Sequence, residues 1–311
     1  MNLKELLCSL PFEFERSLCF RLNLRLNRRP SSSPFLSGDT FRKLCNFVAD
    51  SDKSFDKLKN AVSSLPEYSV IFVQSNFLLK FQTEILPLIK TQFVLISHNS
   101  DTNIDSRFLP IASSPFLQKW FVQNCTDEIL EASHKVVPLP IGLENQRFHN
   151  AGDVKSFKKL MRLIKNGKIS KKPKILVALN LSTNPDGRFA CYRAFWKKPI
   201  TLEMMSFISS SNYRKIASSC MFIASPAGNG LDCHRTWEAM YLGAVPLVND
   251  NAMNRVFAGL GLPLICVKDW NEFASKTAEE LEDIYKSTTA KADCAALWLD
   301  FWKKKINRVI E

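Results

Sequence analysis

Residues Cys220–Val248 read CMFIASPAGNGLDCHRTWEAMYLGAVPLV, and this stretch decides the fold of the C-terminal half of the chain. An apolar run that ends at Ala224 predicts a buried strand, and a loop rich in proline and glycine follows it. A helix is expected from Asp232, a good N-cap residue, to the region of Gly243, which suits the position after a helix end. A second apolar strand follows at once. In such a strand–loop–helix–strand unit, backbone amides and a helix N-terminus can hold a phosphate group.

The side chains of this segment suit a nucleotide diphosphate. Gly228 and Gly230 let the backbone approach an anion closely. Arg235 and Glu238 are three residues apart and share a face of the predicted helix. The guanidinium can pair with phosphate oxygens, and the carboxylate can accept hydrogen bonds from ribose hydroxyls. The same spacing also fits a surface ion pair worth less than ~1 kcal/mol, and the spacing alone leaves both interpretations open.

Short apolar runs alternate with helical patterns along most of the chain. The predicted buried strands are Ser69–Gln74, Phe93–Ser97, Val136–Leu139, Ile175–Leu179, Cys220–Ala224, Val245–Val248 and Leu264–Val267. The predicted helices are Phe77–Ile89, Ser114–Asn124, Asn212–Ser219, Asp232–Leu242 and Asn271–Ser287. This alternation predicts an α/β protein with parallel sheets that carry helices on both faces.

The polar, lysine-rich stretch Asn145–Lys174 is the expected boundary between two domains. We therefore predict an N-terminal domain over residues 1–145, a linker over 146–173 and a C-terminal domain over 174–289. The last segment, residues 290–311, holds an amphipathic helix that is expected to pack near the domain junction.

Composition narrows the class of partner and the compartment. The formal net charge of +12 favours anionic partners such as nucleotides, and it leaves peripheral membrane contact open. The basic residues lack a zinc-finger spacing or an RNA-binding aromatic motif, so no nucleic-acid partner is expected. Nine cysteines without a CxxC pair favour free thiols over disulfides or a zinc site. Without a transmembrane segment or a secretory signal in the sequence, a cytoplasmic location is expected.

The segment Cys220–Val248 resembles the C-terminal signature of the exostosin-like and ribitol-xylosyltransferase-like GT-B glycosyltransferases. Three further pieces resemble the same group in the same order. They are FVLISHNSD (Phe93–Asp101), WFVQNC with VVPLPIGLEN (Trp120–Asn145), and ILVALNLSTNPDGR (Ile175–Arg188). The resemblance spans roughly residues 70–250 and implies a GT-B fold, with two Rossmann-like domains whose parallel sheets face a cleft.

The resemblance also implies a donor site on the C-terminal domain for a nucleoside diphosphate sugar, linked to UDP. Arg235 would hold the diphosphate, Glu238 the ribose, and His234 would touch the diphosphate or the transferred sugar. The loop residues under the diphosphate would be Ser225, Gly228, Asn229 and Gly230. The residues after the first strand of the domain that would lie under the phosphates or sugar are Thr183, Asn184 and Arg188.

The catalytic base is expected from the segment HNSD, which follows the predicted strand Phe93–Ser97. Ligands of open α/β sheets bind beyond the carboxyl ends of the strands, which places this segment at the cleft. Asp101 or His98 could remove the proton from an acceptor hydroxyl. The alternative for Asp101 is that it only helps to form the turn after the strand, and the sequence leaves both open.

The function that the resemblance implies is transfer of a sugar from a nucleotide sugar to a hydroxyl of an oligosaccharide or other glycan, with inversion and without a metal. The nucleotide sugar is a co-substrate, and no resident cofactor is expected. One rival is a metal-dependent GT-A transferase, because Asp50-Ser51-Asp52 imitates an Asp-x-Asp metal motif. Helical spacing over Phe41–Ala49 favours a helix-end turn there instead. Another rival is a protein that binds nucleotides or glycans without turnover.

Overall fold

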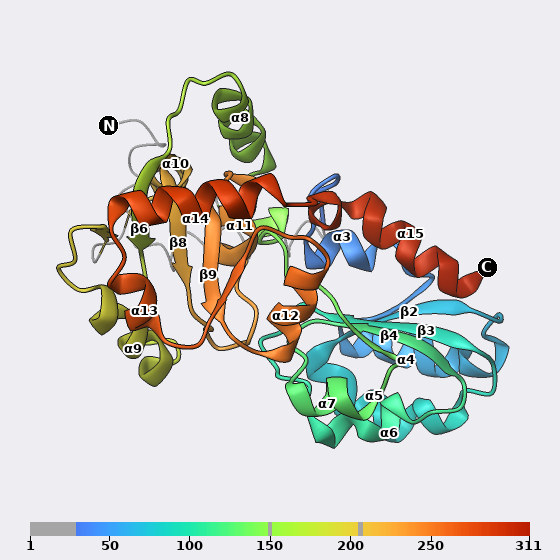
Figure 1. Cartoon of the computed structure of the whole chain (residues 1–311). Helices are drawn as coiled ribbons and strands as arrows, with labels where there is room; N and C mark the ends of the chain where they lie inside the picture. The colour runs from blue at the N-terminus through green and yellow to red at the C-terminus, as the bar shows by residue number, and fades with distance from the viewer. Residues whose placement is uncertain (1–28, 149–150, 205–207) are drawn as a thin grey trace, which may run out of the picture.

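The computed structural model describes residues 29–148, 151–204 and 208–311. Residues 1–28, for which the sequence predicts no secretory signal, lie outside this part. The described chain forms two lobes, each built around one parallel five-stranded sheet (Figure 1). The predicted fold class, two Rossmann-like domains of the GT-B type, is confirmed.

The N-terminal sheet has the strand order β1-β2-β3-β4-β5, and every neighbouring pair is parallel. Its strands are β1 (Phe47–Ala49), β2 (Ser69–Gln74), β3 (Phe93–His98), β4 (Leu117–Val122) and β5 (Val136–Pro138). Its helices are α3 (Gly38–Arg42), α4 (Asp52–Ala61), α5 (Leu78–Glu84), α6 (Leu109–Ala112) and α7 (Asp127–Ala132). Helices α4 to α7 cover one face of this sheet in Figure 1, and α3 lies on the other.

The C-terminal sheet has the order β10-β9-β8-β6-β7 and is also wholly parallel. Its strands are β6 (Lys172–Val177), β7 (Thr201–Glu203), β8 (Cys220–Ser225), β9 (Val245–Asn249) and β10 (Ile265–Val267). The helices of this half are α8 (Val154–Lys165), α9 (Pro185–Phe195), α10 (Ser210–Ser219), α11 (His234–Tyr241), α12 (Ala252–Gly259), α13 (Trp270–Ala274) and α14 (Ala278–Ala290). Short 3₁₀ turns complete the connections: Val62–Ser64, Ser75–Phe77, Leu86–Leu88, Ser106–Phe108, Gln146–Phe148 and Ala295–Leu297.

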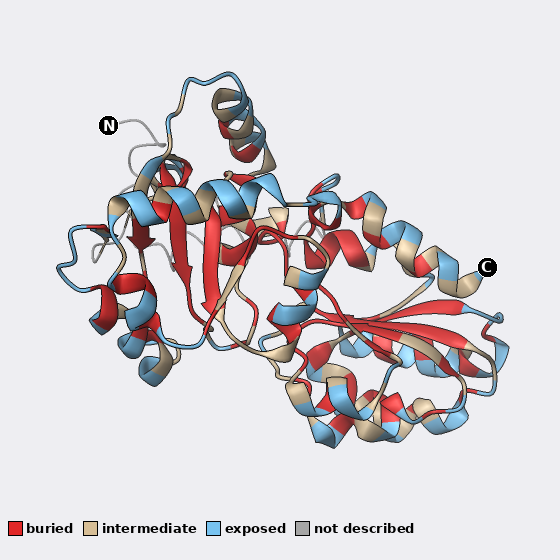
Figure 2. Ribbon diagram, in the orientation of Figure 1, coloured by how far each residue is buried: buried red, intermediate tan, exposed pale blue. Residues whose placement is uncertain are grey.

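The last helix, α15 (Leu299–Ile310), returns to the N-terminal domain and packs on the face of its sheet that carries α3 (Figure 1). Trp302 is fully buried there and meets the ring of Phe41 edge-on, with 6.4 Å between ring centroids. Just before the helix, Leu299 donates its backbone N–H to the carbonyl of Pro34. The described part of the chain therefore starts and finishes in the N-terminal domain, and the strands of both sheets are buried beneath helices with exposed outer faces (Figure 2).

Several predicted elements differ from the structure. The stretch Ser114–Asn124, expected as a helix, contains the strand β4 instead. The helix expected over Phe41–Ala49 ends at Arg42, and β1 follows it. The helix expected over Asn271–Ser287 is broken into α13 and α14 by a new N-cap at Thr277. The lysine-rich linker contains α8, whose Phe157 and Leu160 are buried.

Candidate active site

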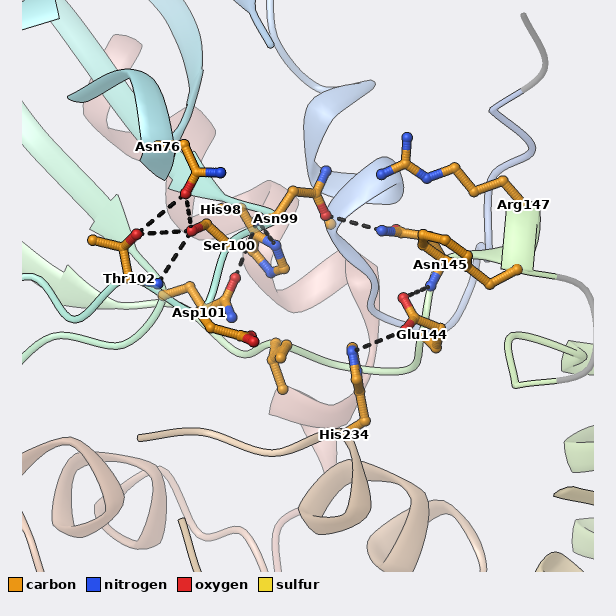
Figure 3. A pocket seen from close by; sticks show the side chains of 14 residues that line it. Asn76, His98, Asn99, Ser100, Asp101, Thr102, Glu144, Asn145, Arg147 and His234 are labelled. Atoms are coloured by element: carbon orange, nitrogen blue, oxygen red, sulfur yellow. Dashed lines mark hydrogen bonds and ion pairs between the residues drawn. The ribbon is translucent and has the colours of Figure 1, made fainter. Parts of the chain in front are cut away.

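A polar cavity of about 460 Å³ lies where the carboxyl ends of the two sheets meet. The N-terminal domain contributes the side chains that follow β2, β3, β4 and β5, and α11 contributes His234 (Figure 3). Most of the lining groups are amides, hydroxyls or carboxylates: Asn76, Asn99, Ser100, Asp101, Thr102, Gln123, Glu144 and Asn145. Such a lining suits a ligand with several hydroxyl groups better than an apolar one.

His98 is 1% exposed at the end of β3, and both of its ring nitrogens are engaged. Nδ1 accepts a hydrogen bond of 2.7 Å from the backbone N–H of Asn99. Nε2 must then carry the proton, and it lies 3.0 Å from the carbonyl oxygen of Pro140. Burial lowers the pKa of His98 to about 4, so the ring is neutral at pH 7.

Asp101 is exposed and faces the cavity from the turn after β3. A small hydroxyl network holds this turn: Ser100 Oγ lies 2.9 Å from Thr102 Oγ1 and accepts from the Thr102 backbone N–H. Both hydroxyls also bond to the side-chain carbonyl of Asn76 (Figure 3). Asp101 Oδ2 accepts a hydrogen bond of 3.3 Å from Asn229 Nδ2 of the other domain. The turn-forming and cleft-facing interpretations of this segment are thus both compatible with its geometry.

The cavity residues that were not identified from the sequence include Glu144 and Asn145, which follow β5. Asn145 Nδ2 donates to Asn99 Oδ1 at 2.9 Å and so ties the segments after β5 and β3 together. Glu144 Oε2 lies 3.7 Å from His234 Nε2 across the domain boundary. His234 Nδ1 donates to the carbonyl of Gly142 at 2.8 Å, which fixes the orientation of its ring. The position of Glu144 and Asn145 after the predicted strand Val136–Leu139 is a signal that the sequence offers, and the same kind of position identifies Asp101.

The loop after β8, residues 226–233, is well ordered by its own backbone and by neighbouring side chains. Gly228 N–H donates to the carbonyl of Gly230 at 3.0 Å, and Ala227 N–H donates to Asn249 Oδ1 at 2.8 Å. Ser225 is buried, and its Oγ lies 2.9 Å from Thr236 Oγ1, so this hydroxyl joins the strand to α11. The backbone amides of this loop that remain available are therefore those nearer its tip and the start of α11.

Arg188 connects the predicted 183–188 segment to this loop. Its Nε donates to the carbonyl of Ala227 at 3.2 Å, and its Nη1 donates to the carbonyl of Asn180 and to the hydroxyl of Thr183. Asn184 Nδ2 donates to the same Ala227 carbonyl at 3.2 Å. A Cβ on Gly228 would lie 2.6 Å from Arg188 Nη2, so a larger residue would require the guanidinium to move. The structure thus brings Thr183, Asn184, Arg188 and Gly228 together.

Arg235 presents an unsatisfied donor. Its Nη1 is buried and makes no hydrogen bond to any residue that the structure describes. No carboxylate of the described chain lies within 4 Å of the side chain of Arg235 or of Arg188. Burial lowers the pKa of Arg188, and the nearby charge of Arg235 lowers it further. A buried cation, Arg188, and a half-buried one, Arg235, repel each other without a carboxylate between them, which favours an anion from outside the chain.

The start of α11 adds further donors beside Arg235. The backbone N–H groups of His234 and Arg235 donate to no acceptor within residues 29–148, 151–204 and 208–311. Glu238 lies one turn on, and its carboxylate likewise accepts no hydrogen bond from this part of the chain. Burial raises the pKa of Glu238, while His234, Arg214 and Arg235 act in the opposite direction. A guanidinium and a carboxylate without a described hydrogen-bond partner therefore lie one turn apart on this helix.

In the Asp50-Ser51-Asp52 segment, which imitates a metal-binding motif, Asp50 forms ion pairs with two arginines. Asp50 Oδ2 lies 2.8 Å from Arg42 Nε and 3.0 Å from Arg29 Nη2, and its other oxygen accepts from Ser54 Oγ. Ser51 is the N-cap of α4, so Asp52 belongs to the first turn of that helix. Within the described residues there is no cluster of three or more His, Cys, Asp or Glu side chains able to hold a metal ion. Asp50 therefore serves to anchor α3 and α4.

The C-terminal half of the chain is similar to a known domain. Residues 168–310 match the RXYLT1 C-terminal domain, and this range contains Cys220–Val248, which carries the resemblance noted from the sequence. No finding points specifically to the exostosin-like group. No curated protein sequence matches the chain.

The chain is similar to several solved structures. The α,α-trehalose-6-phosphate synthase from Burkholderia multivorans is 11% identical, with a TM-score of 0.47 over 83% of this chain and 73% of that chain. The UDP-forming synthase from Burkholderia vietnamiensis is 11% identical, with a TM-score of 0.48 over 84% and 78%. AviGT4, a glycosyltransferase involved in avilamycin A biosynthesis, is 7% identical, with a TM-score of 0.41 over 82% and 78%.

The described helices include none that is both long and apolar enough to cross a membrane.

Proposed function

We propose that this protein is a glycosyltransferase that moves a sugar from a UDP-linked donor to a hydroxyl of a glycan acceptor, with inversion and without a metal ion. The match of residues 168–310 to the RXYLT1 C-terminal domain supports a transferase of that type. The observation that carries the proposal is the buried Nη1 of Arg235, which has no described partner and lies beside the open amides of α11.

The donor diphosphate would bind at this point. The guanidinium of Arg235 and the N–H groups of His234 and Arg235 can together donate to phosphate oxygens, and the N-terminal end of α11 adds a partial positive charge. Arg188 would act mainly by fixing the loop through Ala227, since most of its donors are already used by the chain. These groups are in place before the reaction, so they can stabilise the charge that develops on the leaving diphosphate.

Glu238 would bind the ribose. Its carboxylate is half-buried and lies near Arg235, without a hydrogen-bond donor from the described chain to occupy it. A carboxylate accepts hydrogen bonds from two adjacent hydroxyls readily, and the ribose of a nucleotide supplies such a pair.

Asp101 is the better candidate for the catalytic base. Both nitrogens of His98 are committed to Asn99 and Pro140, so that imidazole has no lone pair to offer. Asp101 is exposed in the cavity and touches the donor loop at Asn229. In the proposed step, Asp101 takes the proton of the acceptor hydroxyl as its oxygen attacks the anomeric carbon. The bond from that carbon to the diphosphate oxygen breaks, and the nucleoside diphosphate leaves with the bonding electrons.

Ligand-dependent thermal unfolding tests the proposal. UDP, GDP, CMP and several UDP-sugars are compared in the presence of EDTA. A ligand at 100 times its Kd should add about 2.7 kcal/mol to the free energy of unfolding. We expect UDP and one or more UDP-sugars to stabilise the protein under chelation. The proposal fails if no nucleotide raises the melting temperature, and its metal-free part fails if stabilisation or turnover requires Mn²⁺ or Mg²⁺.

A further inference from the structure

Asn124 ends the WFVQN segment and has no part in the chemistry proposed above. It follows β4, is fully buried, and has a positive φ of 59°. Its side chain makes one contact to each domain. Nδ2 donates to the carbonyl of Ser100 at 3.2 Å, and Oδ1 accepts from the backbone N–H of Asp232 at 2.9 Å. The amide therefore joins the turn that carries Asp101 to the loop that precedes α11.

The contact between Asn124 and this loop is close enough to require glycine. A Cβ built on Gly230 would lie 2.4 Å from Asn124 Nδ2, closer than real Cβ atoms come to any heavy atom. Gly230 is buried against this amide, while Asn229 beside it is exposed and reaches Asp101. The second glycine of the loop is thus explained by the packing of one domain on the other.

Asp232 fixes the same junction from the other side. Its buried carboxylate accepts from the backbone N–H of Ile141 at 2.8 Å, and from Trp237 Nε1 at 2.9 and 3.0 Å. Ile141 follows β5 of the N-terminal domain, whereas Trp237 belongs to α11. Three consecutive segments of the N-terminal domain, after β3, β4 and β5, are therefore held to one short loop of the C-terminal domain.

We propose that Asn124 is a positioning residue that sets the spacing between the catalytic turn at Asp101 and the donor loop at residues 228–232. The inference rests on the proposed transferase function. It adds that the loop is anchored to the N-terminal domain, so that the base and the donor are aligned by one buried amide. The role requires a side chain with both a donor and an acceptor, as an amide has. The donor is needed for the carbonyl of Ser100, and the acceptor for the backbone N–H of Asp232.

Two variants test the role in different ways. Asn124→Asp keeps the shape and the acceptor but places a carboxylate oxygen against the Ser100 carbonyl. Gly230→Ala leaves every hydrogen-bonding group in place and pushes the loop away from Asn124. Gly259→Ala is the matched control for the second variant, because a Cβ there would meet nothing within 4 Å. Asn60→Asp, at an exposed position on α4, is the control for the first.

The readouts are kcat per nucleotide-binding site, the Kd for UDP, and the ratio of donor hydrolysis by water to transfer onto the acceptor. A displacement of about 1 Å between reacting groups can cost 10²-fold in rate, so we expect kcat to fall by roughly that factor in both test variants. The Kd for UDP should change less than about threefold, because Arg235 and Glu238 are untouched. The ratio of donor hydrolysis to transfer should rise, since attack by water does not require an aligned acceptor.

The outcomes separate the two proposals. If the wild-type protein binds no nucleotide and transfers no sugar, the proposed function itself is wrong. If the wild type is active and both variants keep kcat and the hydrolysis ratio within threefold of it, Asn124 is only structural and the inference is wrong. The inference is also wrong if the affinity for UDP falls by the same factor as kcat, because the loop then acts only in binding the nucleotide. Should Asn124→Asp fail to fold, Gly230→Ala decides.

Discussion

The side-chain amide of Asn229 lies 3.3 Å from the carboxylate of Asp101, although the two residues are 128 positions apart and belong to different domains. Both residues are exposed, so this contact stands at the open edge of the cleft. It brings the loop expected to bind the donor against the turn expected to bind the acceptor. The first prediction concerns this pair.

Asp101→Asn should abolish transfer while leaving the Kd for UDP within about threefold of the wild type. The asparagine oxygen can still accept from Asn229, so the contact across the cleft is kept, but the side chain no longer takes up a proton. Loss of a general base costs about 10²–10⁴-fold in rate. Steady-state kinetics and UDP titration measure the two effects, with Glu131→Gln as an exposed control. Transfer at the wild-type rate would mean that another group is the base.

Arg235→Ala should lower kcat/KM by about 10²-fold or more, because a preorganised charge beside the leaving diphosphate is removed. Arg255→Ala is the control, since Arg255 is exposed on α12 and pairs with Asp250 and Asp127 on the surface. Initial rates over a range of donor concentrations give the ratio for each variant. Equal values for wild type and Arg235→Ala would exclude this guanidinium from the mechanism.

Glu238→Gln should weaken binding of UDP by about 10-fold or more, since a hydrogen bond to a charged group is worth about 1.5–3 kcal/mol. The sharper test compares UDP with its 2′-deoxy and 3′-deoxy forms. The wild type should prefer the ribonucleotide, and the variant should lose most of that preference. Glu282→Gln, on the exposed face of α14, should bind all three as the wild type does. A preference that survives in Glu238→Gln would place the ribose elsewhere.

His98 predicts an acid-sensitive fold. Burial lowers its pKa from 6.5 to about 4, so between these values the unfolded chain binds a proton that the folded chain does not. The free energy of unfolding should therefore fall as pH drops from about 6.5 towards 4, by about 1.4 kcal/mol per unit from this residue. His98→Asn should flatten this slope, even though it loses stability at pH 7 with the Pro140 contact.

Urea unfolding at pH 7 and pH 5 measures this difference in slope. Burial raises the pKa of Asp232 to about 6, so this residue makes the free energy of unfolding rise as the pH falls. Because Asp232 is present in both the wild type and His98→Asn, its contribution cancels when the two slopes are compared. His134→Asn, at an exposed position, should keep the wild-type slope. An unchanged slope in His98→Asn would show that the ring is not held neutral.

The unit β8–α11–β9 was predictable because its local signals agree. The apolar run, the glycine loop and the terminating Gly243 each favour the same elements, and Gly243 has the positive φ of 66° expected after a helix. The start of the helix was less accurate. Asp232 was expected as its N-cap, but Cys233 occupies that position, and the Asp232 carboxylate is used to hold Ile141. A contact between domains overrode a local preference.

The strand β4 was predicted wrongly for a reason visible in its register. Phe93 pairs with Leu117 but Val94 pairs with Lys119, so Gln118 is skipped in a bulge. The bulge breaks the alternation that identifies a strand, and the apolar residues that remain fall at helical spacing. The apolar spacing therefore predicts a helix here and hides the position of Asn124 after the carboxyl end of a strand. By contrast, the break before α14 had a readable signal in the capping box of Thr277 and Glu280.

The return of α15 to the first sheet bears on how this protein is made. During synthesis the strands of the N-terminal sheet emerge before the C-terminal domain, but the helix that carries Trp302 and covers their second face emerges after it. The face of the sheet that carries Phe41 therefore stays exposed to water while the whole second domain is translated. The nascent chain thus presents an apolar sheet face to water until α15 has left the ribosome and can pack on it.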